Sequence, residues 1–271
     1  MSVEPGLILS DPLPVEAAEP VRAYVVPGRN RRLVVVLAGS AQGGFDPAFY
    51  GQAVSSGENH AMFVQDESRS WMNGPGVADE MVRLITEYRD ANGIEEIVTL
   101  GHSMGGFAAM VLAQLMPVNT VIAFAPQFSL DPELVPDEGR WPDAQIGPDA
   151  RFRDVGDLKA EGTRYFIFHG DNPWEAWHWL RFPWRREGFE HFILAGQAHN
   201  LVRVLAKRRM LGNVVAQAIG QKSRAVRLAL EKSFLGRSLL VQRRAAYQAA
   251  HPGLVVTGGA PMVVPPIEGA A

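Results

Sequence analysis

Short apolar runs alternate with amphipathic helical patterns along most of this chain, and this alternation constrains the fold more than any other feature. The run at residues 32–38 (RLVVVLA) has three consecutive valines, which is typical of a strand buried on both faces. Further strands are expected at residues 61–65, 94–100, 119–125, 164–169 and 191–194. Helices are expected between and after them, at residues 78–92, 104–116 and 201–218. This order predicts an α/β fold with a doubly wound, mostly parallel sheet, to which residues 21–26 add an antiparallel edge strand.

The segments outside this alternation suggest how the chain is divided. Residues 1–20 form an acidic, proline-rich N-terminal segment, and residues 21–220 form the α/β domain. Within that domain, residues 127–162 are rich in Pro, Asp and Gly, and this long connection predicts a small lid or insertion over the strand ends. Residues 221–250 have a basic, amphipathic pattern that predicts a helical extension. The Pro- and Gly-rich residues 251–271 are expected to be disordered.

The charge is distributed unevenly between the two ends of the chain. Residues 1–200 carry 15 Lys and Arg against 27 Asp and Glu, whereas residues 201–271 carry 11 against 2. The basic C-terminal helix either packs on the acidic body or meets an anionic membrane surface or acidic partner. No known nucleic-acid motif accompanies the charge, so we expect no nucleic-acid partner. With no signal-peptide pattern and no apolar run of about 18 residues, we expect a cytoplasmic protein.

The most specific motif is G-x-S-x-G, with Ser103 at its centre, in the sequence GHSMG at residues 101–105. It follows a predicted strand and precedes a predicted helix. A serine at such a sharp turn has a strained backbone, and glycines on both sides leave room for the close approach of neighbouring backbone. The turn also sets the serine at a helix N-terminus, where backbone N–H groups stabilise negative charge. This context indicates a nucleophilic serine.

With this motif and this order of elements, residues 21–218 resemble the α/β-hydrolase superfamily. The stretches GHSMGGFAAM at residues 101–110 and AFAPQ at residues 123–127 look like bacterial hydrolases of unassigned substrate, some linked to polysaccharide or secretion systems. The resemblance implies a Ser–acid–His triad in that chain order. It places the catalytic histidine at His199, in the loop after the last predicted strand.

The resemblance places the acid in the loop after the strand at residues 164–169. Asp171 lies one residue after Gly170 and Glu175 lies five residues after it, and neither spacing is the common one in the family. Both carboxylates therefore stay open as candidates for the acid. The alternative role for each is a loop carboxylate that caps the following helix.

Acyl chemistry also needs two N–H donors for the developing oxyanion. One is expected from the backbone of Met104, directly after Ser103. By resemblance, the second comes from the backbone of Ser40, with Ala41 next, in the glycine-rich loop after residues 32–38. Asp66 and Trp71 follow a strand on the same sheet edge and are candidates to line the substrate pocket.

Other chemistry finds little support in the sequence. The chain has no cysteine, no phosphate-binding glycine motif and no histidine pair with metal-ligand spacing, so we expect no cofactor and no metal. The tryptophans clustered after the acid loop predict a core-packed helix, or alternatively an aromatic wall of the substrate pocket or a membrane-facing patch; they are Trp174, Trp177, Trp179 and Trp184.

These observations predict a serine hydrolase that cleaves an ester, thioester or related acyl substrate through an acyl-enzyme. The substrate is expected to be a small molecule, a lipid or a saccharide carrying an acyl group. One alternative is an acyltransferase that acts on a sugar or lipid acceptor. The other is a non-catalytic binding module with the same fold.

Overall fold

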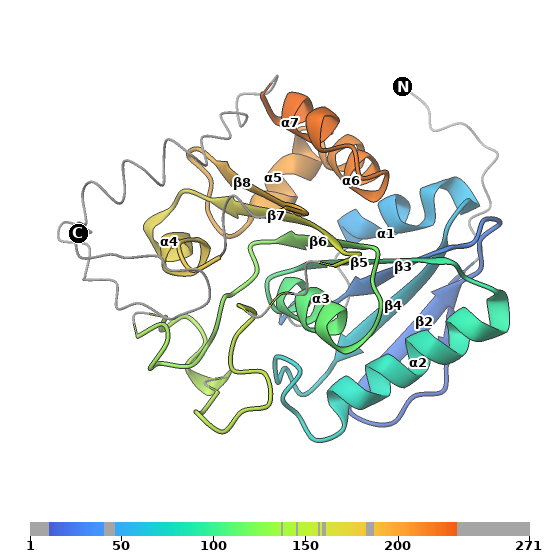
Figure 1. Cartoon of the computed structure of the whole chain (residues 1–271), viewed down its shortest axis with the longest axis horizontal. Helices are drawn as coiled ribbons and strands as arrows, with labels where there is room; N and C mark the ends of the chain where they lie inside the picture. The colour runs from blue at the N-terminus through green and yellow to red at the C-terminus, as the bar shows by residue number, and fades with distance from the viewer. Residues whose placement is uncertain are drawn as a thin grey trace.

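The computed structural model describes residues 11–40, 47–136, 138–144, 146–156, 158, 161–182 and 187–231, and in this part of the chain a single sheet of eight strands forms the centre (Figure 1). The strands are β1 (Leu13–Val15), β2 (Val21–Val26), β3 (Arg32–Leu37), β4 (His60–Asp66), β5 (Glu96–His102), β6 (Thr120–Phe124), β7 (Arg164–Gly170) and β8 (Phe189–Leu194). Their order in the sheet is β1-β2-β4-β3-β5-β6-β7-β8. The strands from β4 to β8 in that order are parallel, which confirms the predicted fold class.

The N-terminal edge of the sheet differs from the prediction. Residues 21–26 do form an antiparallel strand, β2, but β2 is not the edge. The short strand β1 pairs antiparallel outside it, with Leu13 opposite Val25 and Val15 opposite Ala23. Three residues are too short a run to show a periodic signal in the sequence, so β1 was not predicted.

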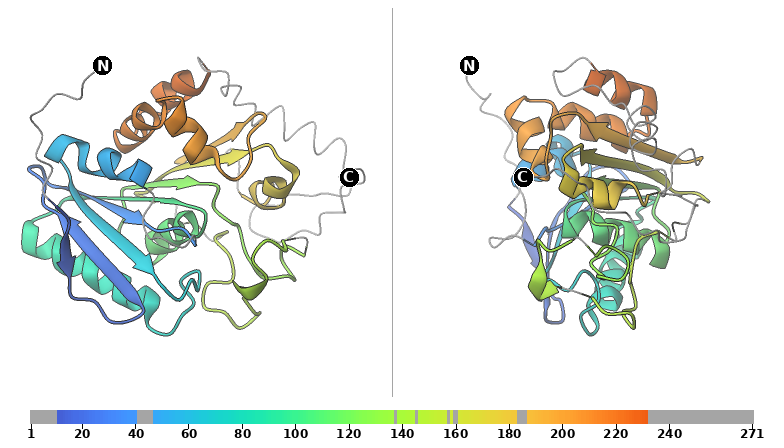
Figure 2. Two further views of the ribbon diagram at one scale, coloured as in Figure 1. Left: turned by 180° about the vertical axis from the view of Figure 1, so that it is seen from behind. Right: turned by 90° about the vertical axis from the view of Figure 1, so that its left-hand side faces the viewer.

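Helices cover both faces of the sheet (Figure 2). They are α1 (Pro47–Val54), α2 (Val77–Asn92), α3 (Met104–Leu115), α4 (Pro173–Trp179), α5 (Leu201–Lys207), α6 (Leu211–Ile219) and α7 (Ser223–Glu231), with short 3-10 turns η1 (Ser55–Gly57) and η2 (Pro142–Ala144). Helices α1, α5, α6 and α7 pack on one face through one buried cluster, and α2, α3 and α4 contribute to the cluster on the other. The domain is therefore a helix–sheet–helix sandwich with a core on each face.

The single helix predicted at residues 201–218 is wrong, because the chain breaks between α5 and α6. Arg209 has a left-handed backbone with φ of 57°, and the Met210 N–H reaches back to the carbonyl of Leu205 at 2.9 Å. On either side of this turn, α5 and α6 both bury apolar residues against the sheet, such as Leu205 and Val214. A turn formed without Gly or Pro leaves no local signal in the sequence.

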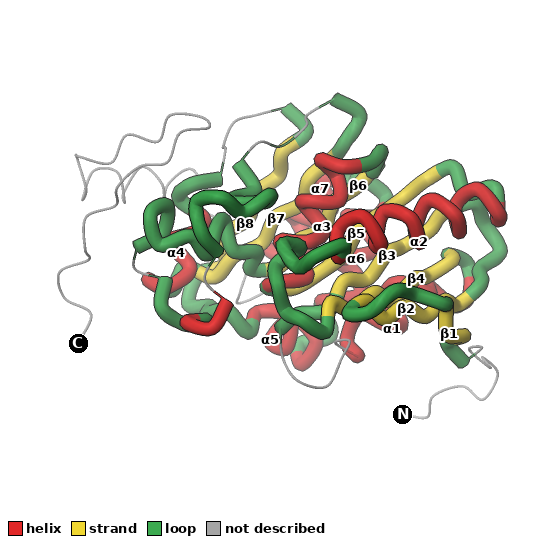
Figure 3. The backbone as a smooth tube through the Cα atoms, turned by 90° about the horizontal axis from the view of Figure 1, so that it is seen from below, coloured by secondary structure: helices red, strands yellow, loops and turns green. Residues whose placement is uncertain are grey.

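The strand order creates a switch point beside β3 and β5, which are hydrogen-bonded neighbours in the middle of the sheet (Figure 3). After β3 the chain runs through α1 to β4 on one side, and after β5 it runs through α3 to β6 on the other. The two connections therefore diverge at the carboxyl ends of the strands. Open α/β sheets bind their ligands in the crevice formed at such a point.

The predicted insertion at residues 127–162 has little regular structure where it is described. It contains η2 and one isolated bridge between Ser129 and Asp154. Buried side chains such as Leu130 and Val155 attach it to the core cluster that includes α2 and α3. Of the predicted basic extension, the structure describes α7, whereas residues 232–271 lie outside the described residues, as do residues 1–10.

Candidate active site

The G-x-S-x-G motif forms the turn between β5 and α3, as predicted. Ser103 is buried and has a backbone φ of 59° and ψ of −124°, a strained conformation for a residue with a side chain. A Cβ on Gly101 would lie 2.2 Å from the Gly105 carbonyl carbon, and a Cβ on Gly105 would lie 2.1 Å from the Leu37 oxygen. Both glycines are therefore required by close backbone packing, which fixes Ser103 at the carboxyl end of β5.

His199 lies in the loop between β8 and α5 and points at this serine. Its Nε2 is 2.9 Å from Ser103 Oγ, and its side chain is 28% exposed. The His102 ring donates a hydrogen bond from Nε2 to the backbone oxygen of His199 at 2.7 Å. His102, which occupies the variable position of the motif, thus holds the His199 loop against the turn that carries Ser103.

Of the two candidate acids, the structure brings Glu175 to the histidine. Glu175, in α4, lies 3.0 Å from His199 Nδ1 through its Oε1 atom and is 1% exposed. Asp171 lies at the end of β7, where its Oδ1 accepts a hydrogen bond from the Gly196 N–H at 2.7 Å. The five-residue spacing lets α4 begin before the acid, capped by the Asn172 side chain, so that the first turn of the helix carries Glu175 to the imidazole.

A half-buried cation also contacts this carboxylate. Arg140, from the insertion, places its NH1 atom 2.6 Å from Glu175 Oε1, the same oxygen that His199 contacts. The other oxygen, Oε2, is buried and has no hydrogen-bond partner in the described part of the chain. Burial alone would raise the pKa of Glu175, but the hydrogen bond with His199 and the nearby charge of Arg140 hold it below its usual value. Glu175 is therefore ionised at neutral pH.

Arg140 belongs to a larger cluster with the buried side chains of Glu138 and His178. Its Nε atom is 3.0 Å from both carboxylate oxygens of Glu138. The His178 Nδ1 accepts from the backbone N–H of Phe128 at 3.0 Å, so its Nε2 carries the proton and donates to Glu138 at 2.6 Å. Burial would raise the pKa of Glu138, but the hydrogen bonds from His178 and Arg140 lower it to about 2. The insertion is thus joined to α4 through paired charges.

The two residues expected to donate to the oxyanion, Met104 and Ser40, lie in segments whose backbones are in contact. Met104 is the first residue of α3, and Ser40 follows the end of β3. A Cβ on Gly39 would lie 3.3 Å from the His102 oxygen, so the start of the loop after β3 packs directly on the turn that carries Ser103. Ala41 and the next five residues lie outside the described residues. The role of Met104 and Ser40 as donors stays a prediction.

Two further side chains, Gln127 and Trp71, extend the hydrogen-bonded chain from the serine, and of these only Trp71 was expected near the substrate pocket. Gln127, which follows β6, donates from its Nε2 atom to Ser103 Oγ at 3.0 Å. Trp71 donates from its indole nitrogen to Gln127 Oε1 at 3.1 Å. The half-buried Trp141 lies next to both Trp71 and His199, with ring centroids 6.1 and 5.3 Å away. Gln127 and Arg140 were missed because the sequence shows no signal for contacts between residues so far apart along the chain.

The other candidates from the sequence have structural partners. Asp66 accepts hydrogen bonds from the backbone and hydroxyl groups of Ser68 and Ser70, so it shapes the loop that carries Trp71. His169 is fully buried; its Nε2 donates to the Pro126 oxygen, and its Nδ1 lies 2.9 Å from His191. The tryptophans after the acid loop differ from one another, since Trp177 and Trp179 are buried, Trp174 is 52% exposed and Trp184 lies outside the described residues.

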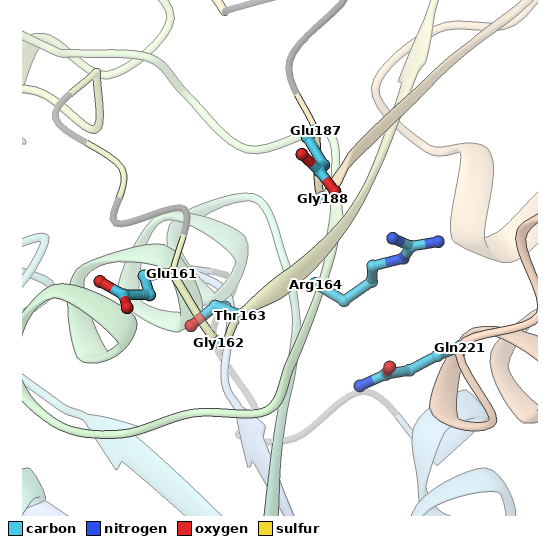
Figure 4. A pocket seen from close by; sticks show the side chains of 7 residues that line it. All are labelled: Glu161, Gly162, Thr163, Arg164, Glu187, Gly188 and Gln221. Carbon is cyan, nitrogen blue, oxygen red and sulfur yellow. The ribbon is translucent and has the colours of Figure 1, made fainter.

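A separate cavity of about 470 Å³ lies at the amino ends of strands β7 and β8, whereas Ser103 lies at the carboxyl ends of the strands (Figure 4). Its lining includes Arg164, Thr163 and Gln221. It is remote from Ser103, which lies at the carboxyl end of β5. Among the described side chains, no group of three His, Cys, Asp or Glu residues is arranged to hold a metal ion. The described helices also include none that is long and apolar enough to span a membrane.

The chain is similar to known proteins in its three-dimensional structure. No protein-family model matches the sequence, and the search of curated proteins finds no match. A puromycin-hydrolysing peptidase from Mycobacterium tuberculosis superposes with a TM-score of 0.54 at 17% identity, over 79% of this chain and 40% of that one. Est1E from Butyrivibrio proteoclasticus gives 0.56 at 13% identity, over 78% of this chain and 100% of that one. The capsule O-acetyltransferase of Neisseria meningitidis serogroup A gives 0.55 at 12% identity, over 75% and 93%.

These similarities are too distant in sequence to transfer an activity, but they agree with one another and with the topology of the sheet. This chain spans less than half of the peptidase and nearly all of the other two proteins. The mostly parallel eight-stranded sheet with helices on both faces matches that common architecture. The chain therefore has the α/β-hydrolase fold.

Proposed function

We propose that this protein is a serine hydrolase that cleaves a carboxylic ester, thioester or related acyl substrate through an acyl-enzyme. The observation that carries the proposal is the continuous hydrogen-bonded chain from Ser103 Oγ to His199 Nε2, and from His199 Nδ1 to Glu175 Oε1, at 2.9 and 3.0 Å. These distances are within the reach that a nucleophile and its base need. The serine also lies at the switch point of the sheet, where substrates of open α/β proteins bind.

In the proposed reaction, Ser103 Oγ forms a bond to the acyl carbon while its proton passes to His199 Nε2. The carboxylate of Glu175 stabilises the imidazolium that results. The negative charge that develops on the carbonyl oxygen is held by the N–H groups of Met104 and Ser40. His199 then gives its proton to the leaving alcohol or thiol. A water molecule, deprotonated by His199, then attacks the acyl carbon. As the C–Oγ bond breaks, His199 passes this proton to Oγ, which releases the acid and restores the serine hydroxyl.

Labelling with a fluorophosphonate probe tests this proposal, because the probe reacts with an activated serine hydroxyl. We expect the native protein to be labelled and Ser103→Ala to be unlabelled. A panel of p-nitrophenyl esters of increasing acyl length then identifies the acyl group that is accepted. Absence of labelling in the folded native protein would instead support the non-catalytic binding module.

A second candidate is transfer of the acyl group to a sugar or lipid. The similarity to a capsule O-acetyltransferase favours including it, since that protein has the same architecture. The two reactions share the acyl-enzyme and differ in the acceptor. Incubation with an activated ester and a saccharide acceptor separates them, because hydrolysis yields free acid and transfer yields an acylated saccharide.

The basic C-terminal region stays a predicted contact for an anionic membrane or acidic partner, and the cytoplasmic location also stays a prediction. In α7, Arg224 and Arg227 are exposed beside Leu228, which is 42% exposed. Cationic and apolar side chains on one helix face favour binding to anionic lipid surfaces. Co-sedimentation with phosphatidylserine vesicles tests this contact, and the variant Arg224→Glu with Arg227→Glu should bind less. Equal binding by both proteins would dismiss it.

A further inference from the structure

Gln127 is a fully buried amide, and in the described structure its side chain is hydrogen-bonded to the hydroxyl of Ser103 and to the indole of Trp71. It lies three residues after the end of β6 and has no exposed surface. Its Nε2 atom lies 3.0 Å from Ser103 Oγ and its Oε1 atom lies 3.1 Å from Trp71 Nε1. Burying a polar amide is unfavourable unless it is hydrogen-bonded, so these two contacts are what stabilise Gln127 in this place.

The chemistry of Trp71 fixes which way the amide of Gln127 points. An indole nitrogen only donates, so it must face the amide oxygen, and the amide NH₂ group must then face the serine. Ser103 Oγ accepts this hydrogen bond, which leaves its single proton free to point at His199 Nε2. At the other end of this hydrogen-bonded chain, the carboxylate of Glu175 can only accept. His199 therefore carries its proton on Nδ1 and presents the lone pair of Nε2 to the serine. The direction of every hydrogen bond from the indole to the carboxylate is therefore determined.

The loop that presents Trp71 is held in an unusual backbone conformation. Trp71 and Met72 have left-handed φ values of 48° and 66°, and Arg69 has a φ of 53°. The buried carboxylate of Asp66 closes this loop through Ser68 and Ser70 as described above. Such strain persists only where surrounding contacts over-determine it, and it is concentrated at functional sites. The loop thus delivers the indole N–H to Gln127 at the expense of local backbone strain.

We infer that Gln127 is a further catalytic residue of the proposed acyl-enzyme reaction, with Trp71 as the residue that orients it; this inference rests on the proposed function. When Oγ bonds to the acyl carbon, its proton goes to His199 and the amide N–H stays on Oγ. When the acyl-enzyme breaks down, the electron pair of the C–Oγ bond returns to Oγ, and the proton returns from His199. In both steps the amide N–H stabilises the partial negative charge on Oγ and keeps the hydroxyl proton directed at the imidazole.

The test compares rates of fluorophosphonate labelling for three variants. Gln127→Met keeps the length of the side chain and removes the donor, and we expect labelling about 10²-fold slower, as for loss of one donor to a developing oxyanion. Gln127→Glu keeps the shape and the acceptor for Trp71, but its carboxylate draws the Ser103 proton away from His199, so labelling should be slower still. Trp71→Phe keeps an aromatic ring but removes the N–H together with the five-membered ring of the indole, and we expect a loss of about tenfold.

The double variant gives the decisive comparison. If Trp71 acts through Gln127, then Trp71→Phe should slow labelling no further in the Gln127→Met background. Complete labelling at long times shows that each variant is folded, because an unfolded chain does not react. Labelling of Gln127→Met at the native rate, or independent losses in the double variant, would overturn the inference while leaving the proposed function intact. Failure of the native protein to be labelled would overturn the proposed function itself.

Discussion

The shared oxygen of Glu175 leads to a quantitative prediction for the substitution Glu175→Gln. His199 Nδ1 and Arg140 NH1 both contact Oε1, whereas Oε2 has no partner in the described structure. The glutamine can therefore place its one carbonyl oxygen at Oε1 and its NH₂ group at the vacant side. The hydrogen bond to His199 and the tautomer of the imidazole are then retained, and only the negative charge is lost.

The loss of that charge sets the expected magnitude. Opposite charges 3.0 Å apart attract by about 5 kcal/mol at an effective dielectric constant of about 20. Because the His199 side chain is 28% exposed, solvent screens part of this, and we expect a loss of about 4 kcal/mol in stabilisation of the imidazolium. This corresponds to roughly a thousandfold in rate, since about 1.4 kcal/mol is tenfold. The buried NH₂ group also lacks an acceptor, which should lower the free energy of unfolding by about 1–3 kcal/mol.

The assay is the second-order rate constant for fluorophosphonate labelling, with kcat/KM for p-nitrophenyl acetate as a second measurement. Asp171→Asn is the matched control, because it changes the other candidate acid in the same loop, and it should react within about threefold of the native protein. A native rate in Glu175→Gln would refute the assignment of Glu175. A thousandfold loss confined to Asp171→Asn would show that the other carboxylate is the acid.

Two further predictions concern ionisable side chains in and around the core. Arg140→Met leaves Glu138 and Glu175 buried without their shared cation, so the free energy of unfolding should fall by about 3 kcal/mol in urea titrations, and an unchanged midpoint would contradict this. Burial lowers the pKa of His169 to about 3, so this residue is neutral when folded and takes up a proton on unfolding below about pH 6.5. Stability should therefore decrease as the pH falls from about 6.5 to 3, and His169→Gln should reduce that slope by up to about 1.4 kcal/mol per pH unit; an unchanged slope would place the titration elsewhere.

Much of the fold could be predicted from local patterns in the sequence. Apolar runs predicted seven of the eight strands. The glycines on both sides of Ser103 predicted a sharp turn, and the structure shows the close backbone contacts that require them. The errors have local causes as well. The break at Arg209 uses a left-handed residue that is not glycine, and β1 is too short to show a period.

The candidate site was less accessible to sequence reasoning, because its parts meet only in three dimensions. The resemblance to α/β-hydrolases limited the acid to two carboxylates in one loop. Only the three-dimensional direction of the first turn of α4 distinguishes Glu175 from Asp171. Gln127 and Arg140 lie in a segment without periodic pattern, and their partners are 24 and 35 residues away in the chain. Contacts of this kind depend on how the insertion packs, which no local propensity determines.

The guanidinium of Arg140 has a consequence for how this protein can change. A long connecting segment usually tolerates changes in length and sequence. Here the same segment also supplies the counter-ion of Glu175. Replacing it with a loop of similar length but without an arginine would leave the buried carboxylate of Glu175 without this cation, so grafted loops should fail unless they restore a positive charge at that point.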